Sequence, residues 1–163
     1  MAGRAVEATQ KALYNFGPGL LTRNYWDQAA NNRKGAWLGR LQAAAGPHKD
    51  KDTDPHSAGR ALDIILFAAD PSEKDFADRI VKVFLDLKSK ISFISVIYNG
   101  KEWNAAGVQF PRSGDAVNRH VTHIHIEWGK TGVCVDAFGA DLEDALYNEF
   151  SAGNISSGDY AVG

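Results

Sequence analysis

The order of hydrophobic and polar positions predicts a chain in which helices alternate with short strands. Segments with helical spacing or helix-capping residues are 4–14, 24–45, 70–90 and 141–150. Apolar, β-branched or alternating runs typical of strands are 61–67, 91–98 and 102–105, and the stretch 118–128 is expected to supply a further strand. We therefore expect an α+β fold, in which an antiparallel sheet is flanked by helices.

The strongest local signals lie in the middle of the chain. Asp70 can cap a helix whose first position is Pro71, with Glu73 at the capping-box place, and the helix is predicted to end near Lys88–Lys90. The pair Asn99-Gly100 directly follows the strand 91–98 and is typical of a tight hairpin turn. The segment 106–119 is interpreted as a loop leading to the last strand.

Two other boundaries rest on glycine and proline. Gly17-Pro18-Gly19 is expected to follow the end of the first helix, and Gly46-Pro47 to stop the helix 24–45, whose residues Trp26 and Trp37 are assigned to the core. The small polar residues from Ser151 onward are predicted to be a loose tail. Nothing divides the chain, so residues 1–163 are expected to form one domain.

Composition narrows the classes of function. The 163 residues carry a net charge of −2 with a pI near 6.2, so no basic field indicates nucleic acid or an anionic membrane as partner. Cys134 is the single cysteine, which excludes an internal disulfide and a cysteine-rich zinc cage, and is interpreted as a small buried hydrophobe. We find neither a signal peptide nor a membrane span, so synthesis in the cytoplasm without a signal peptide is expected.

Two stretches carry candidate metal chemistry. NRHVTHIHIEW, residues 118–128, contains three histidines, and a strand would place His123 and His125 on one face. DPHSAGRALDIILF contains His56 and, seven positions later, Asp63 in an apolar run. A catalytic zinc ion takes three protein ligands and keeps one place for water, and His56, Asp63 and one histidine of the His123/His125 pair would supply such a set. The alternative is a set of structural histidines, with the Asp63 carboxylate paired to an arginine, Arg60 or Arg119.

Both stretches carry a family resemblance. HSAGRALDI resembles the His-x6-Asp motif of zinc peptidases of the M15 and LAS group, which cleave D-amino-acid bonds in bacterial cell walls and share a fold with Hedgehog domains. HVTHIHIEW resembles the closing motif of the same group, and ISVIYNGKEWNA is similar to its strand-turn-Trp segment. The resemblance covers about residues 55–128 and implies a Hedgehog/DD-peptidase-like fold.

The same resemblance implies the roles of particular residues. His56, Asp63 and His125 would bind zinc, while His123 and His120 would line the active site without binding the metal. Thr122 stands where M15 enzymes carry their catalytic carboxylate, so we expect His123, with His120, to transfer the protons instead. Glu127 is a further candidate for proton transfer, ranked below the histidines because it lies beyond the last ligand.

Further candidates are ranked lower. His48 is expected to be a solvated loop residue, and Ser57 and Arg60 are expected to support the first motif. Substrate contacts could come from Asn118, Arg119, Tyr98 or Trp103, although each is better explained as structural or solvated, and Arg23, Arg33 and Arg40 are unranked candidates for binding a terminal carboxylate.

The predicted function is zinc-dependent hydrolysis of peptidoglycan stem peptides, as a carboxypeptidase or an endopeptidase. Without a signal peptide, the enzyme would be a phage lysis enzyme or an antibacterial effector that a secretion machine carries to the periplasm or cell wall of a target bacterium, with an immunity protein in the producer. The alternative is a Hedgehog-like metal-binding interaction module. A two-histidine phosphodiesterase is disfavoured because the serine of His56-Ser57-Ala58 stands one place early.

Overall fold

A six-stranded antiparallel sheet is the centre of the computed structural model, which describes residues 2–20, 41–42, 60–129 and 138–151. The strand order is β1-β2-β6-β3-β4-β5. The elements are α1 (Ala2–Leu20), β1 (Leu41–Gln42), β2 (Ala61–Ile65), α3 (Pro71–Asp86), α4 (Lys88–Ile91), β3 (Ser95–Tyr98), β4 (Lys101–Asn104), β5 (Gln109–Pro111), α5 (Ala116–Arg119), β6 (His123–Glu127) and α6 (Gly139–Ser151).

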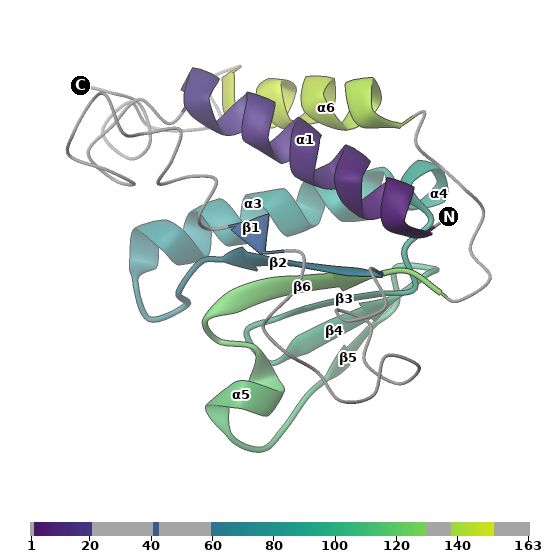
Figure 1. Ribbon diagram of the computed structural model, residues 1–163. Coiled ribbons are helices and arrows are strands. Elements are labelled where there is room, and N and C mark those ends of the chain that lie inside the picture. The colour runs from purple at the N-terminus through teal and green to yellow at the C-terminus, as the bar shows by residue number, and fades with distance from the viewer. Residues whose placement is uncertain (1, 21–40, 43–59, 130–137, 152–163) are drawn as a thin grey trace.

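Helices α1, α3 and α6 lie together on one side of this sheet (Figure 1). Their apolar side chains form one hydrophobic core with the strands, which extends from Ala5 in α1 to Phe150 in α6. Aromatic rings join the helices, since the Phe16 and Phe150 ring centroids are 5.2 Å apart and those of Phe76 and Phe150 are 4.7 Å apart. The predicted α+β class, with an antiparallel sheet and flanking helices, is confirmed.

The two faces of the sheet differ in chemistry. Residues directly opposite each other on paired strands share a face. The register Leu62↔Ile126↔Val96 therefore places these fully buried apolar side chains toward the helices. The register Asp63↔His125 places a carboxylate and an imidazole on the face turned away from the helices. The apolar face builds the core, and the polar face carries the candidate chemistry.

Helix α3 begins as predicted. The Asp70 carboxylate accepts hydrogen bonds from the backbone N–H groups of Ser72 and Glu73, and Pro71 occupies the first helical position. The Glu73 carboxylate does not complete the capping box, because it accepts the backbone N–H of Phe67 instead, at 3.0 Å. It thereby ties the helix start to the chain leaving β2.

The end of this helix and the next strand differ from the prediction. The helix ends at Asp86, and a separate short helix, α4, occupies Lys88–Ile91 before β3 begins at Ser95. Beyond it the hairpin is confirmed, with both turn residues at positive φ, 50° for Asn99 and 79° for Gly100, as this tight turn requires. Strand β4 pairs with β3 over Lys101–Asn104.

Three other predicted elements were wrong in part. Helix α1 runs through Gly17-Pro18-Gly19 to Leu20. Residues 41–42, predicted as helix, form strand β1 and pair with β2, while most of the segment 24–45 lies outside the described residues. The predicted loop 106–119 contains strand β5 and the short helix α5. Helix α1 packs against α6 and β1 pairs with β2, and such contacts between distant segments override local signals. Strand β5 instead pairs with the neighbouring strand β4.

The last helix is confirmed within two residues of its predicted bounds, as α6 spans Gly139–Ser151. The predictions for Trp26, Trp37, Cys134 and the tail beyond Ser151 concern residues that the structure does not describe. No helix in the described part of the chain is long and apolar enough to cross a membrane.

Candidate metal and proton-transfer site

The centre of the candidate site is a buried pair on neighbouring strands. Asp63 on β2 and His125 on β6 are directly opposite each other in the sheet and are only 7% and 6% exposed. His125 Nδ1 lies 3.2 Å from Asp63 Oδ1. The pairing explains how a carboxylate is tolerated in the apolar run ALDII, because burying an unpaired charge would cost several kcal/mol.

Glu127 completes the surroundings of this imidazole. It lies two residues after His125 on β6, hence on the same face of the sheet, and its Oε1 is 2.9 Å from His125 Nε2. Glu127, a further candidate for proton transfer ranked below the histidines, therefore contacts the predicted ligand His125 directly. The signal was present in the sequence, because residues i and i+2 of a strand always share a face.

The two other histidines lie beside the pair. His123 Nε2 is 3.8 Å from Asp63 Oδ1, and the His123 Nδ1 is 3.1 Å from the hydroxyl oxygen of Thr122. The His120 ring centroid is 4.8 Å from that of His123 and 5.4 Å from that of His125. The three predicted histidines and Asp63 thus form one cluster.

His120 does not belong to the strand. It follows the last residue of α5 with a φ of 54°, a left-handed conformation that is uncommon for residues other than glycine. Burial lowers the pKa of His120 to about 4, outweighing the hydrogen bond to the Asn118 carbonyl oxygen, while the neighbouring His123 and His125 lower the pKa further. The His120 ring is therefore neutral near pH 7.

The pKa of His125 moves in the opposite direction. Burial lowers this pKa, but the hydrogen bonds and negative charges of Asp63 and Glu127 outweigh burial and raise the pKa to about 9. Without a metal, the ring is therefore held as a cation between two carboxylates.

The Asp63–His125 pair fits two ligands of one zinc ion. Carboxylate and imidazole ligands bind zinc at about 2.0–2.2 Å, so two tetrahedral ligand atoms lie about 3.3 Å apart. Asp63 Oδ1 and His125 Nδ1 are hydrogen-bonded to each other at 3.2 Å, so both atoms are already close to this spacing. Glu127 stands at the other ring nitrogen, as the carboxylate partner of a zinc-bound histidine does.

The third predicted ligand, His56, lies outside the described residues. The described ranges alone contain no group of three histidine, cysteine or acidic side chains arranged to hold a metal ion. The predicted set of His56, Asp63 and His125 therefore has two members in place and stays a prediction.

Several lower-ranked candidates serve other contacts. Arg60 Nη1 donates to the Trp128 carbonyl oxygen at 3.0 Å, and Arg119 Nε donates to the Gly114 carbonyl oxygen at 3.0 Å. Tyr98 and Trp103 share the helix-facing side of the sheet, opposite the histidines. Candidates outside the described residues are His48, Ser57, Arg23, Arg33 and Arg40.

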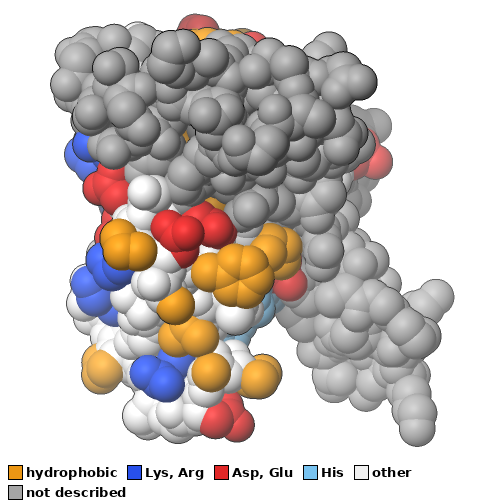
Figure 2. Space-filling model, turned by 90° about the vertical axis from the view of Figure 1, so that its left-hand side faces the viewer, with side chains coloured by type: hydrophobic (Ala, Val, Ile, Leu, Met, Phe, Trp, Pro, Cys, Tyr) orange, Lys and Arg blue, Asp and Glu red, His pale blue; other side chains and the backbone are white. Residues whose placement is uncertain are grey.

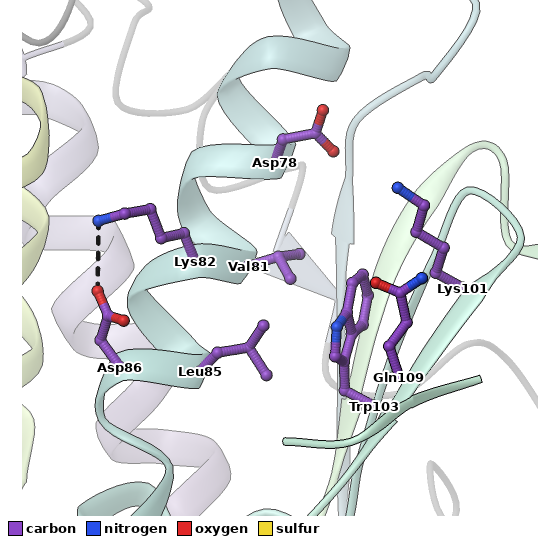
Figure 3. Close-up of a pocket in the computed structure, with 8 residues that line it drawn as sticks. All are labelled: Asp78, Val81, Lys82, Leu85, Asp86, Lys101, Trp103 and Gln109. Carbon is purple, nitrogen blue, oxygen red and sulfur yellow. Dashed lines mark hydrogen bonds and ion pairs between the residues drawn. The ribbon is translucent and has the colours of Figure 1, made fainter. Parts of the chain in front are cut away.

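A hollow of about 330 Å³ between α3 and the strands β4 and β5 is separate from this cluster. Trp103 and Leu85 point into it from opposite walls, and Lys101 stands at its rim (Figure 3). The Lys82 side chain points away from it and donates to Asp86. The hollow lies on the helix-covered side of the sheet. Figure 2 shows histidine side chains, in pale blue, beside hydrophobic side chains.

Comparison with known proteins gives one family. The family model described as "VldE, C-terminal domain" matches residues 22–123, more than half of the chain. The match includes Asp63, His120 and His123 and ends before His125. No curated protein matches the chain, and no solved structure does.

Proposed function

Because the chain belongs to the VldE C-terminal domain family, which is related to the M15-like peptidases, we propose that it is a zinc-dependent peptidase. Its substrates would be peptidoglycan stem peptides that contain D-amino acids. The observation that carries the proposal is the buried pair of Asp63 and His125, whose facing atoms are spaced for one zinc ion. The finer assignment, to the M15 or LAS group with a Hedgehog/DD-peptidase-like fold, is part of this proposal.

Asp63 and His125, together with His56, would hold the zinc ion. Glu127 contacts the His125 ring at Nε2, so Nδ1, which faces Asp63, would be the atom that binds the metal. When bound there, zinc would supply a nucleophile at neutral pH and polarise the scissile carbonyl.

The protons would be carried by the two remaining histidines. His123 lies between Thr122 and Asp63, and the Thr122 hydroxyl forms a hydrogen bond with His123 Nδ1. Thr122, which stands where M15 enzymes carry a carboxylate, therefore holds the imidazole of the neighbouring His123. His123 would transfer the proton, and His120, whose ring lies beside it at a tilt of 60°, would be its partner in the exchange.

The setting of this activity is part of the proposal. The protein would act in the periplasm or cell wall of a target bacterium, either as an antibacterial effector carried by a secretion machine or as a phage lysis enzyme. An effector would require an immunity protein in the cell that produces it.

The test is digestion of purified peptidoglycan by the wild type and by His125→Ala in added zinc, with the products read by mass spectrometry. Release of stem-peptide fragments by the wild type alone supports the proposal, and the fragment masses identify the bond. His48→Ala is the matched control, since it removes a histidine outside both motifs. If the wild type releases nothing that His125→Ala does not, the peptidase proposal fails. Retained zinc would then favour a Hedgehog-like metal-binding interaction module.

A further inference from the structure

Arg112 connects the edge of the sheet to the turn that carries His120. Its Nη1 donates to Glu102 Oε1 at 2.8 Å, and Glu102 in turn accepts the hydroxyl of Ser95 through Oε2 at 2.9 Å. Its Nε donates to the backbone oxygen of Asn118 at 2.8 Å, and its Nη2 donates to the side-chain oxygen of Asn118 at 2.9 Å. One planar guanidinium thus joins β4 to α5.

Hydrogen bonds fix both the backbone and the side chain of Asn118. Its backbone N–H donates to the Asp115 carboxylate at the start of α5, and its side-chain amide donates to the Ser113 carbonyl oxygen. With both oxygens engaged by Arg112, Asn118 has a fixed orientation. The position of its carbonyl oxygen is therefore set by the sheet edge through Arg112, not by the four-residue helix alone.

The Asn118 carbonyl oxygen also faces His120. His120 Nδ1 lies 3.1 Å from it, and a carbonyl oxygen can only accept a hydrogen bond. Nδ1 must therefore carry the proton in this contact. In a neutral imidazole the other nitrogen then has the free lone pair, so the proton-accepting atom of His120 is Nε2.

The backbone of His120 is fixed by a different element. The Asn99 N–H donates to the His120 carbonyl oxygen at 2.9 Å, and the Gly100 N–H donates to the Arg119 carbonyl oxygen at 2.8 Å. The β3–β4 turn thus holds the position of the His120 backbone, and the Asn118 carbonyl oxygen bonds its ring.

We propose that Arg112 is a positioning residue, which holds the Asn118 carbonyl oxygen so that His120 is kept in its Nδ1–H form with Nε2 ready to accept a proton. The proposal rests on the proposed function only for the use of that proton. The sequence motifs do not include Arg112. Its role is inferred from the three side-chain hydrogen bonds of Arg112 and the one side-chain hydrogen bond of His120.

The direct test is the tautomer of His120, read from the ¹⁵N shifts of its ring in the full chain purified without chelators. The wild type is expected to show the Nδ1–H form at neutral pH. Arg112→Ala is expected to populate the Nε2–H form as well. Arg112→Lys keeps the charge beside Glu102 but cannot donate to three acceptors in one plane, so it should resemble Arg112→Ala. Arg79→Ala, which removes a guanidinium paired with Asp75 on α3, should leave the shifts unchanged.

Activity gives the second readout. In peptidoglycan digestion, both Arg112 variants are expected to lower kcat about tenfold or more with KM and zinc content unchanged, because general acid–base catalysis contributes about 10²–10⁴-fold. The inference is overturned if the His120 ring of the wild type is in the Nε2–H form, or if the tautomer of His120 is unchanged in Arg112→Ala. It is also overturned if Arg112→Lys has the same His120 tautomer as the wild type, since charge alone would then suffice. The ring shifts need no catalysis, so an inactive wild type would count against the proposed function and leave this test intact.

Discussion

His125 Nδ1 lies 3.2 Å from Asp63 Oδ1 although 62 residues separate them in the chain. The antiparallel register of β2 and β6 creates this contact, since it sets the two residues directly opposite each other. A slip of one residue in that register would turn one of the two side chains into the apolar core. The site therefore depends on the same strand pairing that builds the fold.

Asp63→Asn should weaken zinc binding strongly. The change keeps the size of the side chain and removes the negative charge that would hold the metal. We therefore expect the zinc affinity to fall by at least about 100-fold, which is the largest loss typical of a residue that only hydrogen-bonds to a metal ligand. Zinc titration calorimetry measures this. Asp78→Asn, an exposed carboxylate on α3, is the control. Equal affinity in Asp63→Asn and the wild type would remove Asp63 from the ligand set.

Glu127→Gln should have a smaller effect of the same kind. The Glu127 carboxylate fixes the His125 ring through Nε2, so its neutralisation is expected to reduce zinc affinity on the order of 10- to 100-fold. Glu143→Gln on α6 is the matched control. If Glu127→Gln has the same zinc affinity as the wild type, Glu127 only fills space beside the ring.

The metal-free protein should lose stability as the pH rises from about 6.5 to about 9. The pKa of His125 is raised to about 9 in the folded chain, whereas an unfolded histidine titrates near 6.5. The protonated ring therefore stabilises the fold fully below about pH 6.5, and this contribution, at most about 3 kcal/mol, disappears as the pH rises through the folded pKa.

Urea unfolding of chelator-treated protein at several pH values measures this effect. His125→Gln should flatten the pH dependence in this window, and His48→Ala should keep it. An unchanged slope in His125→Gln would assign the titration to another group.

His123→Ala should reduce kcat on peptidoglycan by about 10²–10⁴-fold and retain zinc, because the residue is assigned to proton transfer. His120→Ala should act in the same direction. Steady-state kinetics with parallel zinc analysis separate a catalytic loss from a metal loss. Full activity in both variants would remove the two histidines from the mechanism even if zinc is bound.

Asp70→Ala should destabilise the fold by about 0.5–2 kcal/mol, because two backbone N–H groups at the start of α3 lose their acceptor. Thermal unfolding should show a lower Tm. Asp78→Ala removes an exposed carboxylate from the same helix, where a surface pair contributes only about 0.3–0.5 kcal/mol, and serves as the control. Equal Tm values for the two variants would contradict the capping role.

The elements that sequence could predict are those with local causes. Asp70 and Pro71 define the start of α3, and Asn99-Gly100 defines the hairpin, because each signal acts within a few residues. Helix α1 continues past Gly17-Pro18-Gly19, and β5 forms only beside β4. The extension of α1 could not be predicted locally, because α1 packs against α6 at the other end of the chain. Strand β5 pairs with the neighbouring β4, but its three residues include a proline and give no strand pattern of their own.

The same distinction holds for the site. The histidine spacing correctly placed His123 and His125 on one face, and the motifs brought Asp63 to His125. The left-handed turn at His120 and its connection to Arg112 depend on how α5 is held against the hairpin, and no spacing rule encodes that. Glu127 could have been found, since strand alternation alone places it beside His125.

The hydrogen bonds from the Asn99 and Gly100 amides to the His120 turn have a practical consequence. The exchange of these two amide protons with deuterated solvent reports how often that turn opens, because each proton is protected only while its bond across the turn is closed. Slow exchange at both positions would mark a turn ordered before any substrate arrives. Amide exchange in the hairpin therefore measures the rigidity of the site without a bound metal and without a reaction.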